Sequence, residues 1–184
     1  AREGILPTPG RTLVDAFEEI APGRSAEIYA AYRARQVRMH DLEVQLVPDT
    51  VETLHALREL GFTLGVVTSK RLPIAMQGLD LFKLAPFFEI IVTMEDSPRH
   101  KPAPDPLLVA AQKLGIKPSE AIYVGDADVD MLAAYAAGMS RIWVRWGVGT
   151  LGDLQEAMPD FIVDSMDEVV SLVTKHEQTA ANTK

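Results

Sequence analysis

The sequence predicts an open α/β fold, in which helices cover both faces of a parallel sheet, preceded by a helical segment. Three observations predict it. After Gly61, short apolar runs alternate with helical patterns of about ten residues. Two of these helical patterns end at a glycine, Gly115 or Gly138, as helices commonly do. No β-rich stretch comes before Gly61, so all the expected strands fall in the later part of the chain.

The chain divides into a helical segment, about residues 1–47, and an α/β core, about residues 48–184. The segment has helical spacing from Thr12 onwards, with a break at Pro22-Gly23. Five strands are expected in the core, over residues 62–67, 88–93, 121–124, 141–144 and 161–163. The helices expected between and around them cover residues 48–60, 72–82, 105–114 and 129–137, and a last helix begins at the capping sequence Ser165–Glu168.

Composition excludes several classes of protein. The 184 residues are 47% hydrophobic and 24% charged, as in an ordinary globular protein, and contain no cysteine, so neither a disulfide framework nor thiolate chemistry is available. The net charge is −8 without a long basic run, which argues against nucleic acid as a partner. No apolar stretch reaches the roughly 20 residues that span a bilayer. We expect a cytoplasmic protein, a monomer or homodimer, whose partner is a small phosphorylated substrate rather than a membrane.

Ligands of open parallel sheets bind beyond the carboxyl ends of the strands, so the residues that follow each strand are the candidates for chemistry. Thr68, Ser69 and Lys70 follow the first expected strand and precede a helix. Hydroxyl groups and backbone N–H groups at such a point suit a phosphate oxygen. The alternative is that Thr68 or Ser69 only caps the helix, as these residue types often do.

A lysine in a proline-rich loop follows the second expected strand. Lys101 lies in the sequence His-Lys-Pro-Ala-Pro, where the prolines restrict the backbone. A lysine held in place is useful where negative charge gathers on a phosphoryl group. The alternative is an ordinary surface lysine. Glu95 and Asp96, in the same loop, are interpreted as part of a solvated face.

The third strand end carries the most information. Gly125 is followed by three carboxylates within five residues, Asp126, Asp128 and Asp130. Capping a helix needs one such group, and like charges four residues apart repel each other. A bound cation removes that repulsion, and magnesium takes one or two protein carboxylates together with water and phosphate oxygens. Asp126 and Asp130 are therefore the predicted magnesium ligands, and simple capping is the alternative.

These residues resemble, in order, three motifs of the haloacid-dehalogenase-like hydrolases. Thr68 corresponds to the second motif, Lys101 to the third and Gly125-Asp126-x-x-x-Asp130 to the fourth. The resemblance continues through residues 133–139, Trp146-Gly147 and residues 159–165. It covers nearly the whole chain and is closest to the phosphoglycolate phosphatases and the bacterial inorganic pyrophosphatases with a helical cap.

The resemblance implies a Rossmann-like core, a helical cap of which residues 1–47 are a part, and catalysis through an aspartyl-phosphate with Mg²⁺ as the cofactor. It implies that Thr68 hydrogen-bonds the transferred phosphoryl group and that Lys101 steadies the charge on it. Asp126 would ligate the metal directly, and Asp130 would orient the waters on the metal or the lysine. The specific substrate and the oligomeric state do not follow from it.

The family's first motif, Asp-x-Asp-x-Thr at the end of a first strand, has no match before the helical segment. Asp15 lies in an amphipathic helix with no apolar strand before it. We expect the nucleophile in upstream sequence, and without the first strand we expect an opening in the middle of the sheet and almost no turnover. The alternative function is a non-catalytic homologue that keeps the phosphate and metal sites. Motif order argues against a third possibility, a phospho-acceptor receiver domain, because its acidic residues precede its Thr/Ser and Lys, whereas Asp126 comes last here.

Overall fold

The computed structural model describes residues 13–147, 149 and 157–181. It consists of two compact units, Ala1–Val44 and Gln45–Lys184, and each is described here by itself. In the first unit, helix α1 (Leu13–Ile20) is followed by helix α2 (Ser25–Glu43). Gly23 turns the chain between them with a φ of 76°, which suits a residue without a side chain, and its N–H donates to Glu18 Oε1 at 2.6 Å.

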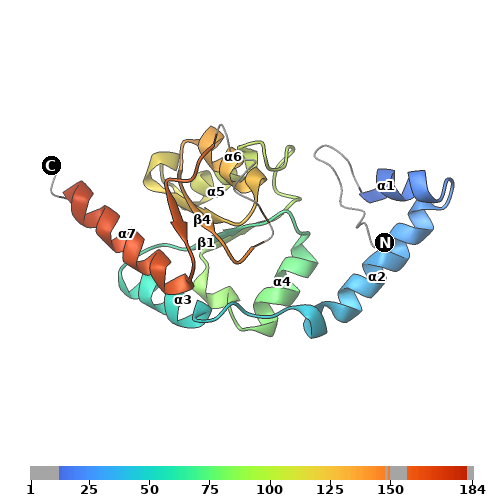
Figure 1. The fold of residues 1–184 in the computed structure, drawn as a ribbon, viewed down its shortest axis with the longest axis horizontal. Coiled ribbons are helices and arrows are strands. Elements are labelled where there is room, and N and C mark those ends of the chain that lie inside the picture. The colour runs from blue at the N-terminus through green and yellow to red at the C-terminus, as the bar shows by residue number, and fades with distance from the viewer. Residues whose placement is uncertain (1–12, 148, 150–156, 182–184) are drawn as a thin grey trace. The chain divides into compact units, whose positions relative to one another are not determined.

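The second unit contains the strands, all of them in parallel pairs. β1 (Gly65–Val67) pairs with β2 (Ile90–Val92), and β3 (Ile122–Gly125), β4 (Ser140–Val144) and β5 (Phe161–Val163) form a second sheet in that order. Helices alternate with these strands along the chain (Figure 1). The predicted α/β class with a parallel sheet is confirmed.

The helices of this unit begin and end close to the residues that the sequence predicts. Their bounds are Thr50–Glu59 for α3, Leu72–Leu81 for α4, Asp105–Leu114 for α5, Asp128–Ala137 for α6 and Met166–Ala181 for α7. Two short 3-10 turns, η1 (Ala85–Phe87) and η2 (Pro118–Glu120), precede β2 and β3. Gly115 and Gly138 end α5 and α6 in the left-handed conformation, as expected from their positions.

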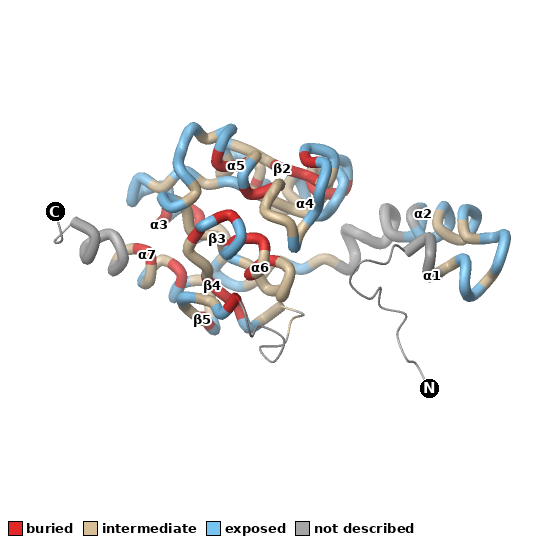
Figure 2. The backbone as a smooth tube through the Cα atoms, turned by 90° about the horizontal axis from the view of Figure 1, so that it is seen from above, coloured by how far each residue is buried: buried red, intermediate tan, exposed pale blue. Residues whose placement is uncertain are grey.

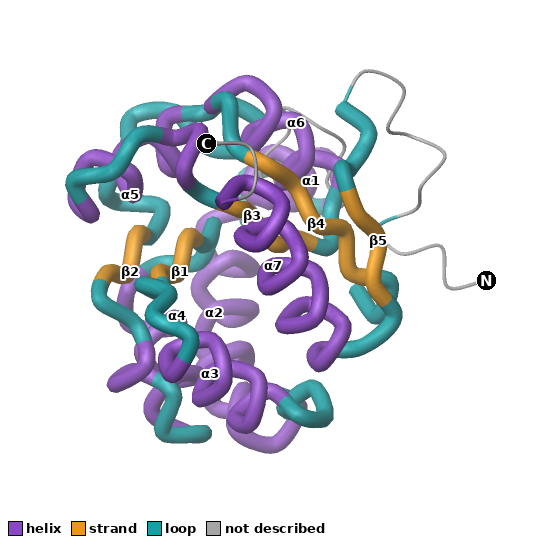
Figure 3. Tube along the Cα trace, turned by 90° about the vertical axis from the view of Figure 1, so that its left-hand side faces the viewer, coloured by secondary structure: helices purple, strands orange, loops and turns teal. Residues whose placement is uncertain are grey.

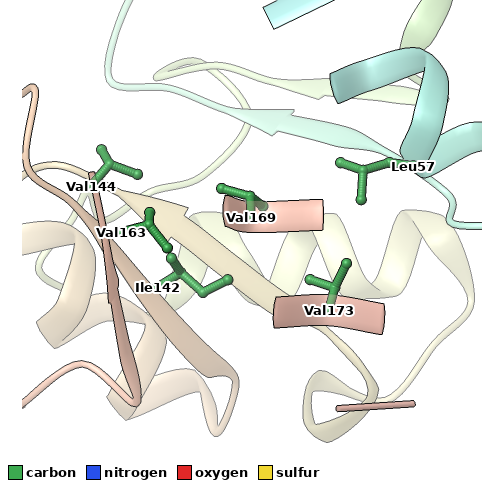
Figure 4. Close-up of a cluster of buried hydrophobic side chains, with 6 residues drawn as sticks. All are labelled: Leu57, Ile142, Val144, Val163, Val169 and Val173. Atoms are coloured by element: carbon green, nitrogen blue, oxygen red, sulfur yellow. The ribbon is translucent and has the colours of Figure 1, made fainter. Parts of the chain in front are cut away.

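Side chains that alternate along β4 divide the core between the two faces of the sheet. Ile142 and Val144 pack with α3, β5 and α7, in the cluster that Figure 4 shows. Trp143 points the other way and packs with Met131 of α6. The small side chains of α6 allow it to pack closely with α5, where Leu107 is fully buried. Figure 2 shows these buried positions along α5, α6, α7 and β4, and they define a helix–sheet–helix arrangement.

Among the strands that the structure describes, none lies between β1 and β3, so the sheet is interrupted in its middle (Figure 3). In a parallel ladder, alternate residues of a strand direct both backbone polar groups to the same neighbour. Thr68 donates its N–H to the carbonyl of Val92 in β2 at 2.9 Å. By this alternation, the backbone groups of Gly65 and Val67 point away from β2, towards the interruption. The predicted opening in the middle of the sheet is therefore present.

The facing edge belongs to β3. Ser140 in β4 donates its N–H to the carbonyl of Ala121 at 3.1 Å, so the groups of Ile122 and Val124 point away from β4. A cavity of about 590 Å³ separates the two edges. Its lining is mainly apolar and includes residues of both strands and of the helices around them, among them Leu57, Gly65, Val67, Leu107, Ile122 and Val173.

The first predicted strand is shorter than expected. Residues 62–64 lie before β1 instead of within it, although Phe62 and Leu64 pack against the cluster around Ile142. An edge strand has hydrogen-bonding partners on one side only, so fewer residues are held in the ladder. The apolar pattern alone does not reveal this, because it reports burial and not the number of neighbouring strands.

We expect the unpaired edges to be visible in amide hydrogen exchange. The amides of Gly65, Val67 and Val124 should exchange at least about tenfold faster than those of Val66 and Tyr123, because only the latter donate within the ladder. The comparison is made by NMR on the same chain, so differences in global stability cancel. Equal protection of the two sets would show that the two edges are bonded to a partner.

Candidate functional site

Thr68 lies directly after β1, where its backbone continues the ladder with β2. Its side-chain Oγ1 accepts a hydrogen bond from the N–H of Lys70 at 3.1 Å. The capping alternative for Thr68 and Ser69 is wrong, because the residue that precedes helix α4 is Arg71. The first N–H of that helix, on Leu72, donates to a side-chain oxygen of Glu95 at 3.2 Å. The Thr68 hydroxyl proton is therefore not needed to form the helix.

Lys101 is buried, with only 9% of its side chain exposed. Its Nζ donates to Asp130 Oδ1 at 2.5 Å and to the phenol oxygen of Tyr123 at 3.0 Å. Burial acts to lower the pKa of Lys101, but Tyr123 and Asp130 stabilise the ammonium and the pKa ends above its ordinary value. The alternative of an ordinary surface lysine is therefore wrong. The following peptide bond, Lys101–Pro102, is cis.

Asp130 joins Lys101 to the start of α6. Its Oδ2 accepts the backbone N–H groups of Asp126 and Ala127 at 3.2 and 3.1 Å, while its Oδ1 receives Lys101. Gly125 makes room for this carboxylate, because a Cβ on Gly125 would lie 2.4 Å from the Asp130 Cβ. Asp130 thus caps the helix, as the capping alternative predicted, and also contacts the lysine, as the resemblance implies. That it ligates magnesium stays a prediction.

Asp126 follows β3, and two glycines approach it closely: Gly147 lies against its side chain and Gly149 against its backbone carbonyl. A Cβ on Gly147 would lie 2.0 Å from the Asp126 Cβ and 2.3 Å from its Oδ2. The N–H of Gly149 donates to the Asp126 carbonyl at 3.0 Å. Backbone approach at this distance requires glycine, and it fixes the position of the aspartate at the strand end.

The carboxylates at the strand ends suit some metal ions and not others. Among the described residues, no group of three or more His, Cys, Asp or Glu side chains is arranged to hold a metal. One carboxylate oxygen of Asp128, Oδ1, already accepts a hydrogen bond from the N–H of Val129 at 2.7 Å. A single well-placed carboxylate, Asp126, fits magnesium, which usually keeps several waters and takes phosphate oxygens as further ligands. It does not fit a metal that needs a complete cage of side chains.

Tyr123, which the motif comparison did not single out, connects the three strand ends. Its hydroxyl donates to the carbonyl of Val67, the residue before Thr68, at 3.2 Å, and accepts from Lys101. A continuous path of hydrogen bonds thus runs from the end of β1 through Lys101 and Asp130 to the backbone of Asp126. A signal was available in the sequence, because a tyrosine in a buried strand needs a partner for its hydroxyl.

Glu95 and Asp96 do more than form a solvated face. Glu95 Oε1 accepts from Arg71 Nε at 2.8 Å, which ties the loop after β2 to the loop after β1. Asp96 accepts the N–H of Thr93 at 2.8 Å and the ammonium of Lys113 at 2.7 Å. The hydrogen bond from Lys113, helped by those from Thr93, lowers the pKa of Asp96 to about 2. These bonds fix the loop that leads to Lys101.

The cavity between β1 and β3 is separate from these polar groups. Its lining includes Val67, Tyr123 and Val124 but not Thr68, Lys101 or Asp126, and it is mainly apolar. It lies between the strands, whereas the polar groups lie at their carboxyl ends. It is therefore a gap in the sheet and not a pocket for a phosphorylated ligand.

Together, a hydroxyl, a buried lysine and carboxylates at the carboxyl ends of parallel strands are groups that enzymes acting on phosphoryl groups use. The pattern of the haloacid dehalogenase-like hydrolases matches residues 1–144, and the chain belongs to this family of enzymes. The resemblance proposed from the motifs is thereby confirmed. No described helix is both long and apolar enough to cross a membrane.

Individual relatives agree with this assignment. The chain is 37% identical to pyrophosphatase PpaX of Bacillus pumilus over 173 residues, which are 94% of this chain and 80% of the relative. A haloacid-dehalogenase-like family hydrolase from Streptococcus pneumoniae is similar in structure, with a TM-score of 0.76, 27% identity and coverage of 89% and 77% of the two chains. A predicted phosphoglycolate phosphatase from Haemophilus somnus has the same fold, with a TM-score of 0.76, 23% identity and coverage of 86% and 74%.

The low pKa of Asp96 gives a testable pH dependence. A carboxyl group whose pKa is lower in the folded state stabilises the fold above its ordinary pKa of 3.8, and this contribution is lost as the pH falls through about 2. We expect Asp96→Asn to lower the free energy of unfolding by about 1 kcal/mol at neutral pH, a figure reduced for solvent screening. The difference from wild type should vanish as the pH falls from about 4 to about 2 in denaturant titrations.

Asp80→Asn, at an exposed position on α4, is the control and should match wild type at every pH. A difference for Asp96→Asn that stays constant across this range would mean that the hydrogen bonds to Thr93 and Lys113 are not what stabilises the loop.

Proposed function

We propose that this chain carries the phosphate- and metal-binding part of a magnesium-dependent phosphohydrolase that acts on a small phosphorylated metabolite. The observation that carries the proposal is the buried ammonium of Lys101, held by Asp130 and Tyr123 next to the ends of β1 and β3. A buried cation fixed by two partners is preorganised to meet negative charge, which is what a transferred phosphoryl group brings.

Lys101 has the hydrogen-bonding capacity that this role requires. An ammonium group has three donors, and two of them are used by Asp130 and Tyr123. The third has no acceptor among the described residues, and we propose that it donates to an oxygen of the phosphoryl group or of the attacking carboxylate. We propose that Lys101 stabilises the negative charge that develops on these oxygens, and that Asp130 holds Lys101 in the required orientation.

Thr68 and Ser69 are the proposed phosphate-binding hydroxyls. Thr68 Oγ1 accepts one hydrogen bond, from the N–H of Lys70, so its own proton can be donated to a phosphoryl oxygen. Ser69 is exposed at the start of the same loop. The Val67 carbonyl, held by Tyr123, keeps this strand end at a fixed distance from Lys101.

Asp126 is the proposed direct ligand of Mg²⁺, and Asp130 acts on the metal site through Lys101 and through the backbone of Asp126. When bound, magnesium neutralises negative charge on the phosphoryl oxygens. The family to which the chain belongs supports a metal-dependent site, and the close packing of Gly147 against Asp126 supports this residue as its ligand. The packing limits how far the carboxylate can turn.

The nucleophile is proposed to be an aspartate on a further strand, outside the described residues, that lies between β1 and β3. Two observations support this: no strand among the described residues pairs with the facing edges of β1 and β3, and an apolar cavity lies between them. The end of a parallel strand in this place would lie between Thr68 and Asp126. Its carboxylate oxygen would bond to phosphorus as the bond to the leaving group breaks, and water would then hydrolyse the aspartyl-phosphate.

Phosphoglycolate and pyrophosphate are the proposed substrate types, since similar proteins carry the names of these activities. The helices of residues 1–44 are proposed to be part of a cap that contributes to this choice, and a cytoplasmic location is proposed with it. The alternative, a non-catalytic homologue that only binds phosphate and metal, predicts binding without turnover in a protein that contains the further strand.

The direct test is phosphate release by a protein that extends this chain with the proposed strand, using pyrophosphate and phosphoglycolate as substrates. We expect phosphate release that depends on Mg²⁺. In Asp126→Ala the release should fall by at least about a hundredfold, because magnesium that is no longer held by Asp126 does not neutralise the charge on the phosphoryl oxygens. The 184-residue chain alone should release almost none. Full activity in EDTA, or vigorous release by the chain alone, would contradict the proposal.

Gly147→Ala tests the position of Asp126 without removing its charge. The added methyl group would overlap the Asp126 side chain, so we expect Mg²⁺ binding to weaken about tenfold or more, as it does when the support of a metal ligand is disturbed. Binding is measured by following the amide resonance of Asp126 during a magnesium titration. Asp128→Ala, which removes a neighbouring carboxylate, is the control and should change binding much less. A larger effect of Asp128→Ala than of Gly147→Ala would indicate that Asp128, and not Asp126, binds the metal.

A further inference from the structure

Tyr123 contacts groups from three separate parts of the chain with one oxygen atom. The phenol oxygen lies 3.0 Å from Lys101 Nζ, 3.2 Å from the Val67 carbonyl oxygen and 3.4 Å from Asp130 Oδ1. The ring packs against the cluster of α5 and α6 that includes Leu107. The hydroxyl is therefore at a point where β1, the loop after β2 and α6 meet.

The directions of these hydrogen bonds follow from the chemistry of the groups. A lysine ammonium can only donate and a carbonyl can only accept, whereas a phenol has one proton and two lone pairs. A lone pair of the Tyr123 oxygen therefore receives a proton of Lys101. The single Tyr123 proton has two acceptors, the Val67 carbonyl at 3.2 Å and Asp130 Oδ1 at 3.4 Å, and the Val67 carbonyl is the nearer of them.

We propose that Tyr123 is a positioning residue that ties the ammonium of Lys101 to the strand end that carries Thr68. The proposal rests on the function proposed above, since it concerns the same site. Asp130 by itself fixes Lys101 only relative to α6. Tyr123 adds a second point of attachment, on β1, and so sets where the lysine lies relative to the phosphate-binding hydroxyl.

Packing alone does not account for a tyrosine at this position. A phenylalanine would fill the same space among Leu107, Ala111 and Ala133, and it would bring no polar group into the core. Burying a hydroxyl is unfavourable unless it is hydrogen-bonded. The hydroxyl here has both a donor and an acceptor partner, and both belong to elements that form the site.

Tyr123→Phe in the 184-residue chain tests the proposal through the ¹⁵N signal of the Lys101 ammonium group. In wild type we expect an ammonium whose protons exchange slowly with water. In Tyr123→Phe the exchange should be about tenfold faster, the factor that corresponds to one lost hydrogen bond. Tyr135→Phe is the matched control, since Tyr135 is exposed and its ring lies under Arg141, and it should leave the signal unchanged. An unchanged Lys101 signal in a folded Tyr123→Phe protein would overturn the proposal.

A measurement on the unaltered chain keeps the test informative if Tyr123→Phe does not fold. The hydroxyl proton of Tyr123, which has the Val67 carbonyl and Asp130 as acceptors, should exchange with water slowly enough to be observed by NMR, whereas that of the exposed Tyr135 should not. A Tyr123 hydroxyl proton that exchanges as fast as that of Tyr135 would overturn the proposal. Both readouts are made without substrate, so they hold or fail independently of phosphate release. In an active, extended protein, Tyr123→Phe should lower kcat and leave KM nearly unchanged, and a change confined to KM would count against positioning.

Discussion

The buried ion pair between Lys101 and Asp130 is the interaction on which the site depends. Only 9% and 7% of the two side chains are exposed, so neither charge can be left without its partner. Removing one member of such a pair typically costs about 3–5 kcal/mol, because the other stays buried and unpaired. The pair joins the loop after β2 to the start of α6, and the Tyr123 hydroxyl extends the connection to β1. One polar network therefore holds three strand ends together.

Two glycines matter as much to the site as its polar groups. Gly125 leaves space for the carboxylate of Asp130, and Gly147 leaves space for that of Asp126. Each aspartate thus packs against backbone, which is less adaptable than a side chain. Charge and close packing act together here, since the carboxylates are placed by contacts that a single added methyl group would disturb.

The order of the strands and helices could be predicted from the sequence because apolar periodicity, glycine ends and proline positions are local signals. Thr68, Lys101 and Asp130 could be chosen as candidate site residues because they follow strands, and parallel strands end at the same edge. The burial of Lys101 and the contacts of Tyr123 with Lys101 and Val67 could not be predicted, because they join residues 22 or more positions apart. The short β1 was also missed, since pairing on one side only is a property of the whole sheet.

We propose that Thr68, Lys101 and Asp126 serve one phosphate-and-cation site. A crystal structure of the chain grown with magnesium and inorganic phosphate would test this. We expect a phosphate within hydrogen-bonding distance of the Thr68 hydroxyl and the Lys101 ammonium, with magnesium bound to the Asp126 carboxylate. Phosphate and magnesium bound at separate places, or Lys101 turned away from both, would contradict it.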